Sequence, residues 1–176
     1  TIVFFFFLHH WTIHWDLRGQ PPYISEVLPH SNINFAFTVE RAWITGITTG
    51  MYTYEVKDTG SIIGTMFKPG GFYPFWKKSI ATITDKEIET VTVFPEANED
   101  FRYALFDQEN DEAMVAKVEE LLLSRKPRID QNLTLITSIL EAVNTDKDLR
   151  TVEMVTERFS ISERTVQYLF KKYVGV

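Results

Sequence analysis

The chain has 176 residues and no cysteine, which excludes disulfide bridges and thiolate metal sites and favours a reducing, cytoplasmic location. Hydrophobic residues make up 44% and charged residues 24%, the balance of a globular protein rather than of a disordered one. The formal net charge of -6 works against nucleic-acid binding, because neutralising phosphate needs lysine and arginine. A function of that kind therefore requires a local basic patch.

An apolar run opens the sequence at Ile2–Leu8 and includes four consecutive phenylalanines. It is too short to cross a bilayer, no basic residue precedes it and no small-residue cleavage site follows it. We therefore expect a buried strand here and no membrane partner.

The sequence up to about Phe75 is typical of short β-strands. Trp11, Ile13 and Trp15 alternate with polar residues, which is the period of a half-buried strand. Five further β-prone runs follow without a helical pattern between them, and this spacing predicts an antiparallel sandwich or barrel, for which we favour a small cupin-like barrel. The five runs are Tyr23–Leu28, Ile33–Val39, Ala42–Thr48, Met51–Val56 and Ser61–Phe67.

Helical periodicity begins after residues 79–106, a stretch that has no clear pattern. We expect helices over residues 112–124 and 131–143, and Asp130 is a good N-cap for the second of them. The whole chain is thus predicted to be α+β, with an antiparallel β part followed by helices. The apolar stripes are Met114, Val118, Leu121 and Leu122 in the first helix and Leu133, Ile136, Leu140 and Val143 in the second.

Two short helices are expected at the C-terminal end. Thr151 and Ser162 are suitable N-caps, and a connection of about three residues separates the two helices. Two capped amphipathic helices joined in this way are typical of a helix-turn-helix, whose second helix faces the major groove of DNA. The residues expected to point inward are Val152, Val155 and Phe159 in the first helix and Val166, Leu169, Phe170 and Tyr173 in the second.

The second of these helices carries the candidate DNA contacts. Arginine can bind guanine through two hydrogen bonds, glutamine can do the same with adenine, and lysine suits phosphate. From Glu157 to Lys172, four basic residues face two acidic ones, so this segment is locally positive. A helical hairpin packed onto a core has the same periodicity, which leaves that alternative open. The expected DNA-binding residues are Arg164, Thr165, Gln167, Tyr168 and Lys171.

These residues belong to a stretch, Val155–Val176, that resembles the first helix-turn-helix of the AraC family. That family's pattern reads Ser-x-Arg-x-Leu-Gln-Arg-Leu-Phe-Lys before a glycine-containing exit. Trp15–Gly19, Val27–His30 and Phe67–Phe75 resemble the N-terminal domain of one uncharacterised subgroup of the same family. The resemblance implies a bacterial transcription activator or repressor, not an enzyme, whose N-terminal domain senses a small-molecule effector or forms a homodimer.

The same resemblance implies three segments. Residues 1–108 would be the cupin-like sensing domain, residues 109–145 the connecting or dimerisation helices, and residues 146–176 the first, incomplete helix-turn-helix. The family joins two helix-turn-helices by a long helix, and this sequence stops at Val176 before that helix. We therefore expect weak binding to duplex DNA, with dissociation constants on the order of 10⁻⁴–10⁻⁶ M. In a homodimer the stripe of residues 131–143 or the preceding helix would take part, and packing of that stripe within the chain is the alternative.

The sequence departs from the family pattern at three positions. Ser160 stands where the family often has glycine in the turn, and it must accept that backbone geometry at some cost. Thr156 replaces a small alanine in the first helix, and Tyr168 stands where an arginine is common, which removes one basic contact.

A cupin-like barrel also raises a metal-dependent enzyme as an alternative function. On a strand, His10 and His14 share a face but lie about 13 Å apart, too far to chelate one ion. We therefore expect no metal, no cofactor and no catalytic residue. A third interpretation is a sensor or dimerisation fragment without DNA affinity of its own. The plausible metal ligands that the metal-enzyme alternative would use are His9, His10, His14, His30 and Glu26.

Three further patterns have a chemical and a plainer interpretation. Residues 68–71 are similar to a phosphate cradle, but Pro69 followed by Gly70 suits the central positions of a type II turn. The acidic residues between Glu99 and Glu112 are typical of a solvated connection leading into a helix. The aromatic surplus either lines an apolar ligand pocket or fills a small β core, and the sequence leaves both open.

Overall fold

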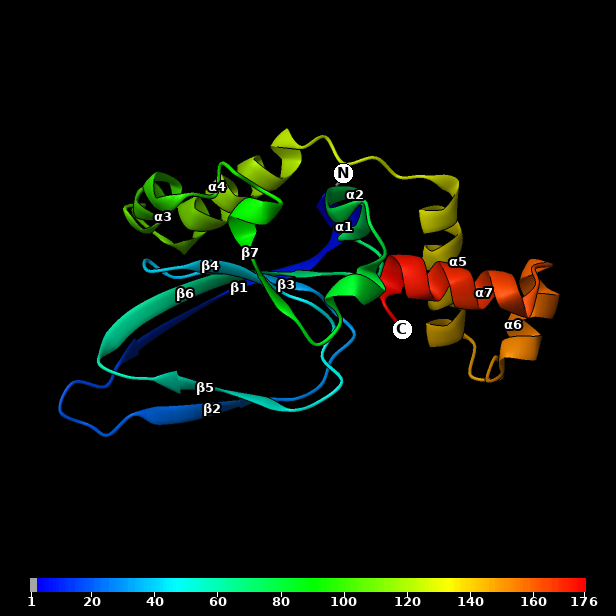
Figure 1. Ribbon diagram of the computed structural model, residues 1–176, viewed down its shortest axis with the longest axis horizontal. Coiled ribbons are helices and arrows are strands. Elements are labelled where there is room, and N and C mark those ends of the chain that lie inside the picture. Colours follow the sequence, from blue (N-terminus) through cyan, green and yellow to red (C-terminus); the bar gives the residue numbers. More distant parts are fainter. Residues whose placement is uncertain (1–2) are drawn as a thin grey trace.

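The computed structural model describes residues 3–176 and shows a mixed α+β fold, in which antiparallel strands come first and helices follow, as predicted. The strands form a five-stranded and a two-stranded sheet. Figure 1 shows helices over one face of the larger sheet and the smaller sheet on its other side. The last three helices gather at one end of the main sheet. None of the helices in residues 3–176 is long and apolar enough to span a bilayer.

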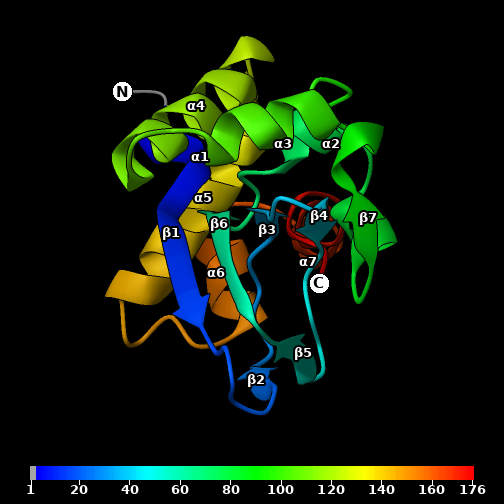
Figure 2. The same ribbon diagram turned by 90° about the vertical axis from the view of Figure 1, so that its left-hand side faces the viewer.

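All pairings in both sheets are antiparallel. The main sheet has the order β1-β6-β3-β4-β7, and β2 pairs with β5 in the small sheet, which Figure 2 shows below the main one. Each predicted β-prone run forms a strand, whereas the short β7 was not predicted. The bounds are Phe7–Asp16 (β1), Tyr23–Val27 (β2), Asn34–Phe37 (β3), Ala42–Thr45 (β4), Tyr52–Val56 (β5), Thr59–Phe67 (β6) and Glu87–Glu89 (β7).

The expected strand at the start of the chain is wrong over Val3–Phe6, which forms one helical turn, α1. Successive side chains of a strand point to opposite faces, so Phe6 and Phe7 could not both face one neighbour. The turn lets both buried rings pack on Phe75, with ring centroids 5.9 and 6.4 Å away. Ile2 lies outside the described residues.

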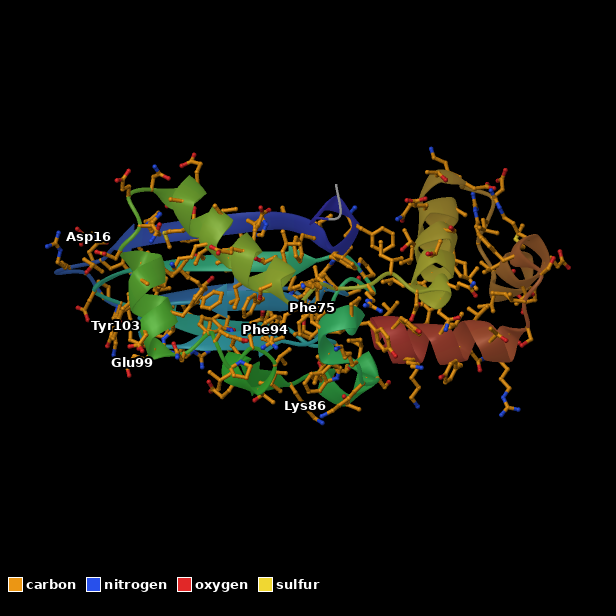
Figure 3. The ribbon with its side chains drawn as sticks, turned by 90° about the horizontal axis from the view of Figure 1, so that it is seen from above. Asp16, Phe75, Lys86, Phe94, Glu99 and Tyr103 are labelled. Carbon is orange, nitrogen blue, oxygen red and sulfur yellow. The ribbon has the colours of Figure 1, made fainter. Side chains whose placement is uncertain are left out.

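Phenylalanines fill the space between the main sheet and the helices that cover it. Phe35 and Phe37 of β3 and Phe67 of β6 are fully buried, and Phe94 stacks on Phe35 at 5.2 Å between ring centroids. Phe75 joins the same cluster, and Figure 3 labels it together with Phe94. The aromatic surplus therefore builds the core on this side of the sheet.

The tryptophans of β1 lie on the other face of the sheet. The indole rings of Trp11 and Trp15 rest on the backbone of Gly64 and Gly60 of β6, where any Cβ would overlap them. The predicted alternation of β1 is thus present, but Ile13 between the two tryptophans is 53% exposed.

The stretch without a clear pattern contains short helices that the sequence did not reveal. Its two 3-10 turns and its α-helix are each eight residues or shorter, too short for a periodic signal. The acidic residues lie mainly in the first turns of two helices, where they complement the helix dipole. The bounds are Tyr73–Trp76 (α2), Ile80–Ile83 (η1), Thr90–Thr92 (η2) and Glu99–Phe106 (α3).

The two longer helices were predicted correctly. They are α4 (Asp111–Ser124), in which all four expected residues are buried, and α5 (Gln131–Thr145), which begins after its N-cap Asp130. Helices α3 and α4 cover the main sheet (Figures 1 and 2). Residues 68–71 form the expected tight turn, because Gly70 has φ 83° and the Gly71 N–H donates to the Lys68 carbonyl (2.8 Å).

The predicted apolar stripe of α5 is correct only in its first half. Leu133 and Ile136 are buried, but Leu140 is half-buried, Val143 is 44% exposed, and Ile139 and Ala142 are buried instead. Three residues turn an α-helix by about 60° less than a full circle. Buried residues at every third position therefore shift step by step around α5, from the side that faces the sheet to the far side. Since Leu133 and Ile136 are covered within the chain, they offer no surface for a dimer contact.

Replacing Gly46 by alanine tests the contact between the end of β4 and η1. The added Cβ would overlap the backbone carbonyl of Ile83, so we expect the free energy of unfolding to fall by roughly 1–3 kcal/mol. Gly50→Ala is the control, since a Cβ there meets nothing within 4 Å, and it should change stability by less than about 0.5 kcal/mol. Urea unfolding followed by tryptophan fluorescence measures both. Equal stability of the two variants would contradict the contact.

Candidate nucleic-acid interface

The C-terminal end consists of α6 (Val152–Phe159) and α7 (Glu163–Leu169), joined by residues 160–162. The Thr151 hydroxyl accepts a hydrogen bond from the Met154 N–H (3.3 Å), and the Ser162 hydroxyl accepts one from the Thr165 N–H (3.1 Å). Both predicted N-caps are confirmed, and each satisfies a helix-terminal N–H that would otherwise lack a partner.

Ser160 ends α6 in the left-handed conformation, with φ 53° and ψ 44°. Its N–H donates to the Glu157 carbonyl (3.3 Å), and the Ile161 N–H donates to the Thr156 carbonyl (3.1 Å). This is the backbone geometry that the resemblance implied for this position, and it costs a non-glycine residue about 1–2 kcal/mol. The turn sends α7 away from α6 at a fixed angle.

The two helices pack on α5 through a small apolar cluster. Val155 of α6 and Val166 of α7 are buried against Ile139 and Ala142 of α5 and against Leu149. Phe159 is half-buried beside them, but Val152, which was expected to point inward, is 43% exposed. It is the first residue of α6, at the end that extends beyond the cluster.

The far end of α7 enters the main core instead. The chain continues as a π-helix, η3 (Phe170–Val174), in which Tyr173 and Val174 are buried. The Ser79 hydroxyl donates to the Lys171 carbonyl (3.1 Å), and the Thr84 hydroxyl donates to the Gly175 carbonyl (3.0 Å). Helix α7 is therefore held at one end by α5 and at the other by the loop after α2.

The opposite face of α7 and of the start of η3, which carries Lys171, is open. Arg164, Gln167, Tyr168 and Lys171 are all exposed, and their spacing of three and four residues places them in one row. The Gln167 amide donates to the Glu163 carboxylate (2.8 Å), a bond between exposed groups one helical turn apart. We call these four residues the α7 row.

Thr165, the fifth candidate, is half-buried. Its hydroxyl is hydrogen-bonded to that of Ser162 (2.8 Å), and its N–H makes the cap described above. Its position makes it part of the cap that starts α7 rather than part of the exposed row.

The four basic residues between Glu157 and Lys172 differ in their interaction partners. Arg158 forms an ion pair with Asp146 (2.6 Å), while Lys172 donates to the Tyr168 hydroxyl (3.1 Å), a hydrogen bond that raises the pKa of Lys172. Arg164 and Lys171 form no ion pair with any residue in the described range 3–176. The positive charges of the segment that have no ion pair within this range, on Arg164, Lys171 and Lys172, therefore lie in or beside the α7 row.

The histidines of β1 do not converge on one point. His10 lies between the Thr65 hydroxyl (2.8 Å) and the Glu119 carboxylate (3.1 Å), whereas His14 lies 2.9 Å from Asp111. Burial lowers the pKa of His10. His10 and His14 thus contact different carboxylates of α4, and no three His, Asp or Glu side chains between residues 3 and 176 gather closely enough to hold a metal ion.

Residues 6–89 match a domain family of unknown function, DUF6597. The match covers both sheets from the start of β1 to the end of β7 and leaves α3 to α7 outside it. No curated protein and no solved structure matches the chain. The similarity therefore concerns the β-rich part alone and gives no information on the α7 row.

Removing the cap of α7 tests how the interface is held. Ser162→Ala deletes the hydroxyl that accepts the hydrogen bond from the Thr165 N–H. We expect the free energy of unfolding to fall by about 0.5–2 kcal/mol. Ser138→Ala is the matched control, because Ser138 is exposed within α5 and alanine is the better helix former there. Thermal unfolding followed by circular dichroism measures both. If the two variants were equally stable, Ser162 would not be a stabilising cap.

The loop between α5 and α6 should weaken in acid. Hydrogen bonds from the Asp148 N–H (3.0 Å) and from Arg158 (2.6 Å) hold the pKa of Asp146 below its ordinary value of 3.8. A lowered folded-state pKa means that this contribution to stability is present above pH 3.8 and is lost as the pH falls through the lowered value. We therefore expect Asp146→Asn to be less stable than wild type at neutral pH and the difference to shrink below pH 3.8. The urea midpoints of the two proteins, measured across this pH range, test the prediction. A difference in midpoint that did not change with pH would contradict it.

Proposed function

We propose that α6 and α7 form a helix-turn-helix of the AraC type and that the protein is a sequence-specific DNA-binding transcription regulator. The observation that carries this proposal is the α7 row, an arginine, a glutamine, a tyrosine and a lysine exposed on one face of a helix held at both ends. In the proposed role the β-rich part senses an effector or forms a dimer, as the resemblance to that family implies.

The distribution of side chains on α7 supports this function over a simple packed hairpin. The inward face of the helix and of η3 supplies Val166, Leu169 and Tyr173 to the two cores. The outward face carries two cations without an ion pair, Arg164 and Lys171, in a chain of net charge -6. Folding does not require these cations, whereas phosphate and base edges are their natural partners.

Each member of the row has a distinct role in the proposed complex. Arg164 lies in the first turn of α7, the part of a recognition helix that enters the major groove, and its guanidinium can bind guanine. Gln167 follows one turn later and would exchange Glu163 for adenine. Lys171 lies one turn further on, where it would meet a backbone phosphate.

The proposed sensing role rests on the open face of β1. Trp11 and Trp15 are half-buried, and the apolar Ile13 between them is 53% exposed. The Trp43 indole N–H donates to the Tyr54 hydroxyl (3.2 Å) and so connects the main sheet with β5 of the small one. We propose that the two sheets form an open cupin-like barrel whose aromatic interior suits an apolar effector.

Two alanine variants separate base recognition from phosphate binding. A duplex is first selected from a random pool by the protein at low ionic strength. Arg164→Ala should then lose about 1–3 kcal/mol of binding free energy and relax the preference at one base pair. Lys171→Ala should weaken all sequences alike and reduce the slope of log K against log salt by about 0.9. Fluorescence anisotropy with the selected and a scrambled duplex measures both effects.

Arg18→Ala is the control for these measurements, because Arg18 is exposed beside Asp16 at the far end of β1 and its loss changes the net charge equally. It should leave affinity and specificity unchanged. If Arg164→Ala behaved like Arg18→Ala, the α7 row would not be the DNA-reading surface. Failure of the pool to yield any enriched duplex would favour a sensor or dimerisation module without DNA affinity.

A further inference from the structure

A concavity of about 480 Å³ lies between α2 and the linker that connects α4 to α5. The volume is in the range of small-molecule sites, roughly 300–1,000 Å³. The linker supplies three cationic side chains and the residue after α2 supplies a fourth. We call this concavity the basic pocket, and its lining residues are Tyr73, Pro74, Lys77, Arg125, Lys126, Arg128 and Asp130.

Most of the positive charge in the basic pocket is not neutralised. Lys77, Lys126 and Arg128 form no ion pair with any residue from 3 to 176, while Arg125 pairs with Glu96 (2.5 Å). Like charges around one concavity repel each other, so their electrostatic interaction energy is unfavourable. An anion bound between them makes the total electrostatic energy favourable. The four cations form a local positive cluster in a chain of net charge -6.

The one carboxylate among the lining residues offsets one of these charges but forms no ion pair with any of the four cations. One oxygen of Asp130 accepts the Leu133 N–H (2.7 Å) as the N-cap of α5, and the other accepts the Tyr173 hydroxyl (2.9 Å). Both oxygens of Asp130 are thus committed to the fold.

The backbone fixes the two lysines of the basic pocket. Lys77 has φ 58° and Lys126 has φ 48°, the left-handed conformation in which helices commonly end. The Lys77 N–H donates to the Tyr73 carbonyl (2.8 Å), and the Lys126 N–H donates to the Leu123 carbonyl (2.9 Å). Pro127 is buried between Lys126 and Arg128 and anchors the linker. The backbone that carries these cations is therefore held in place by hydrogen bonds and by Pro127.

We propose that the basic pocket binds a phosphate group. Arg128 can donate two parallel hydrogen bonds to phosphate oxygens, and the ammonium groups of Lys77 and Lys126 act as point charges. A phosphate dianion offsets most of the charge of three cations, which a single carboxylate does not. The volume that remains beside a phosphate accommodates the organic part of an ester.

Two sources of phosphate fit this chemistry, a free phosphate ester and the backbone of DNA. The ring of Tyr73 in the pocket wall lies 3.9 Å from that of Tyr173, and the Lys172 ammonium is 5.7 Å from the centre of the Tyr73 ring. Lys172 also donates to the hydroxyl of Tyr168 in the α7 row. The basic pocket thus borders the row, and only the DNA source rests on the proposed function.

Calorimetric titration with inorganic phosphate tests the pocket directly. The wild-type protein should bind phosphate, and the double variant Lys126→Gln/Arg128→Gln should bind it at least about tenfold more weakly, because two charged donors are lost. Lys57→Gln/Arg18→Gln removes the same charge from the β5–β6 turn and from the β1–β2 connection, which lie away from α2 and the linker (Figure 1), and should bind as wild type does. Absence of binding at millimolar phosphate, or equal affinity of the two double variants, would overturn the proposal.

A second arm identifies the source. With a selected duplex, loss of the pocket charges should reduce the salt slope by about 0.9 for each backbone phosphate that the pocket holds. An unchanged slope, together with lost binding of inorganic phosphate, assigns the pocket to a free phosphate ester. If the protein bound no DNA at all, the proposed function would fail while the phosphate titration still decided the fate of the pocket.

Discussion

The hydrogen bond between Tyr173 and Asp130 is the contact on which the arrangement of the helices depends. The buried hydroxyl donates to Asp130 (2.9 Å) and accepts from Asn132 (3.1 Å), and burial raises the pKa of Tyr173 to about 12, so the group remains a donor at physiological pH. Leaving such a buried group without a partner costs about 1–3 kcal/mol. Because Tyr173 lies in η3, which continues α7 without a break, its position helps to set the direction of α7. The same carboxylate caps α5, so the start of α5 and the end of the chain are one coupled unit whose energies do not add independently.

Local sequence signals predicted those parts of the fold that local interactions determine. The caps Asp130, Thr151 and Ser162 were found from residue type alone, because a cap is a contact across three residues. The turn at Val3–Phe6 could not be found in this way, since its cause is Phe75, a residue far away in the sequence. The shifted stripe of α5 has a similar origin. Ile139 and Ala142 are buried because α6 and α7 cover a second side of the helix, whereas a periodic pattern assumes one covered side.

The same distinction between local and long-range interactions separates the parts of the candidate site that the sequence predicted from those that it did not. Exposure of Arg164, Gln167, Tyr168 and Lys171 followed from helical spacing, which needs no tertiary information. The ion pair that removes Arg158 from the free charge could not be predicted, since it joins α6 to the loop after α5. The basic pocket was equally hidden, because its cations come from residue 77 and from residues 125–128. A count of charges along the sequence detects only the cations that are neighbours in the chain.

The nearness of the basic pocket to the α7 row has an electrostatic consequence that differs between the two sources of phosphate. Lys172 lies between them, bonded to Tyr168 on one side and over the Tyr73 ring on the other. In the proposed DNA complex, a backbone phosphate in the pocket would add to the attraction for the same DNA molecule. A free phosphate ester would instead place negative charge beside the row. If it lay as close to the row as Lys172 does, within the Debye length of about 8 Å at physiological salt, it would repel DNA. Linkage then requires that DNA weaken the binding of the ester by the same factor. The α7 row and the basic pocket would in that case act as competing sites, and no change in protein conformation is needed for one to report on the other.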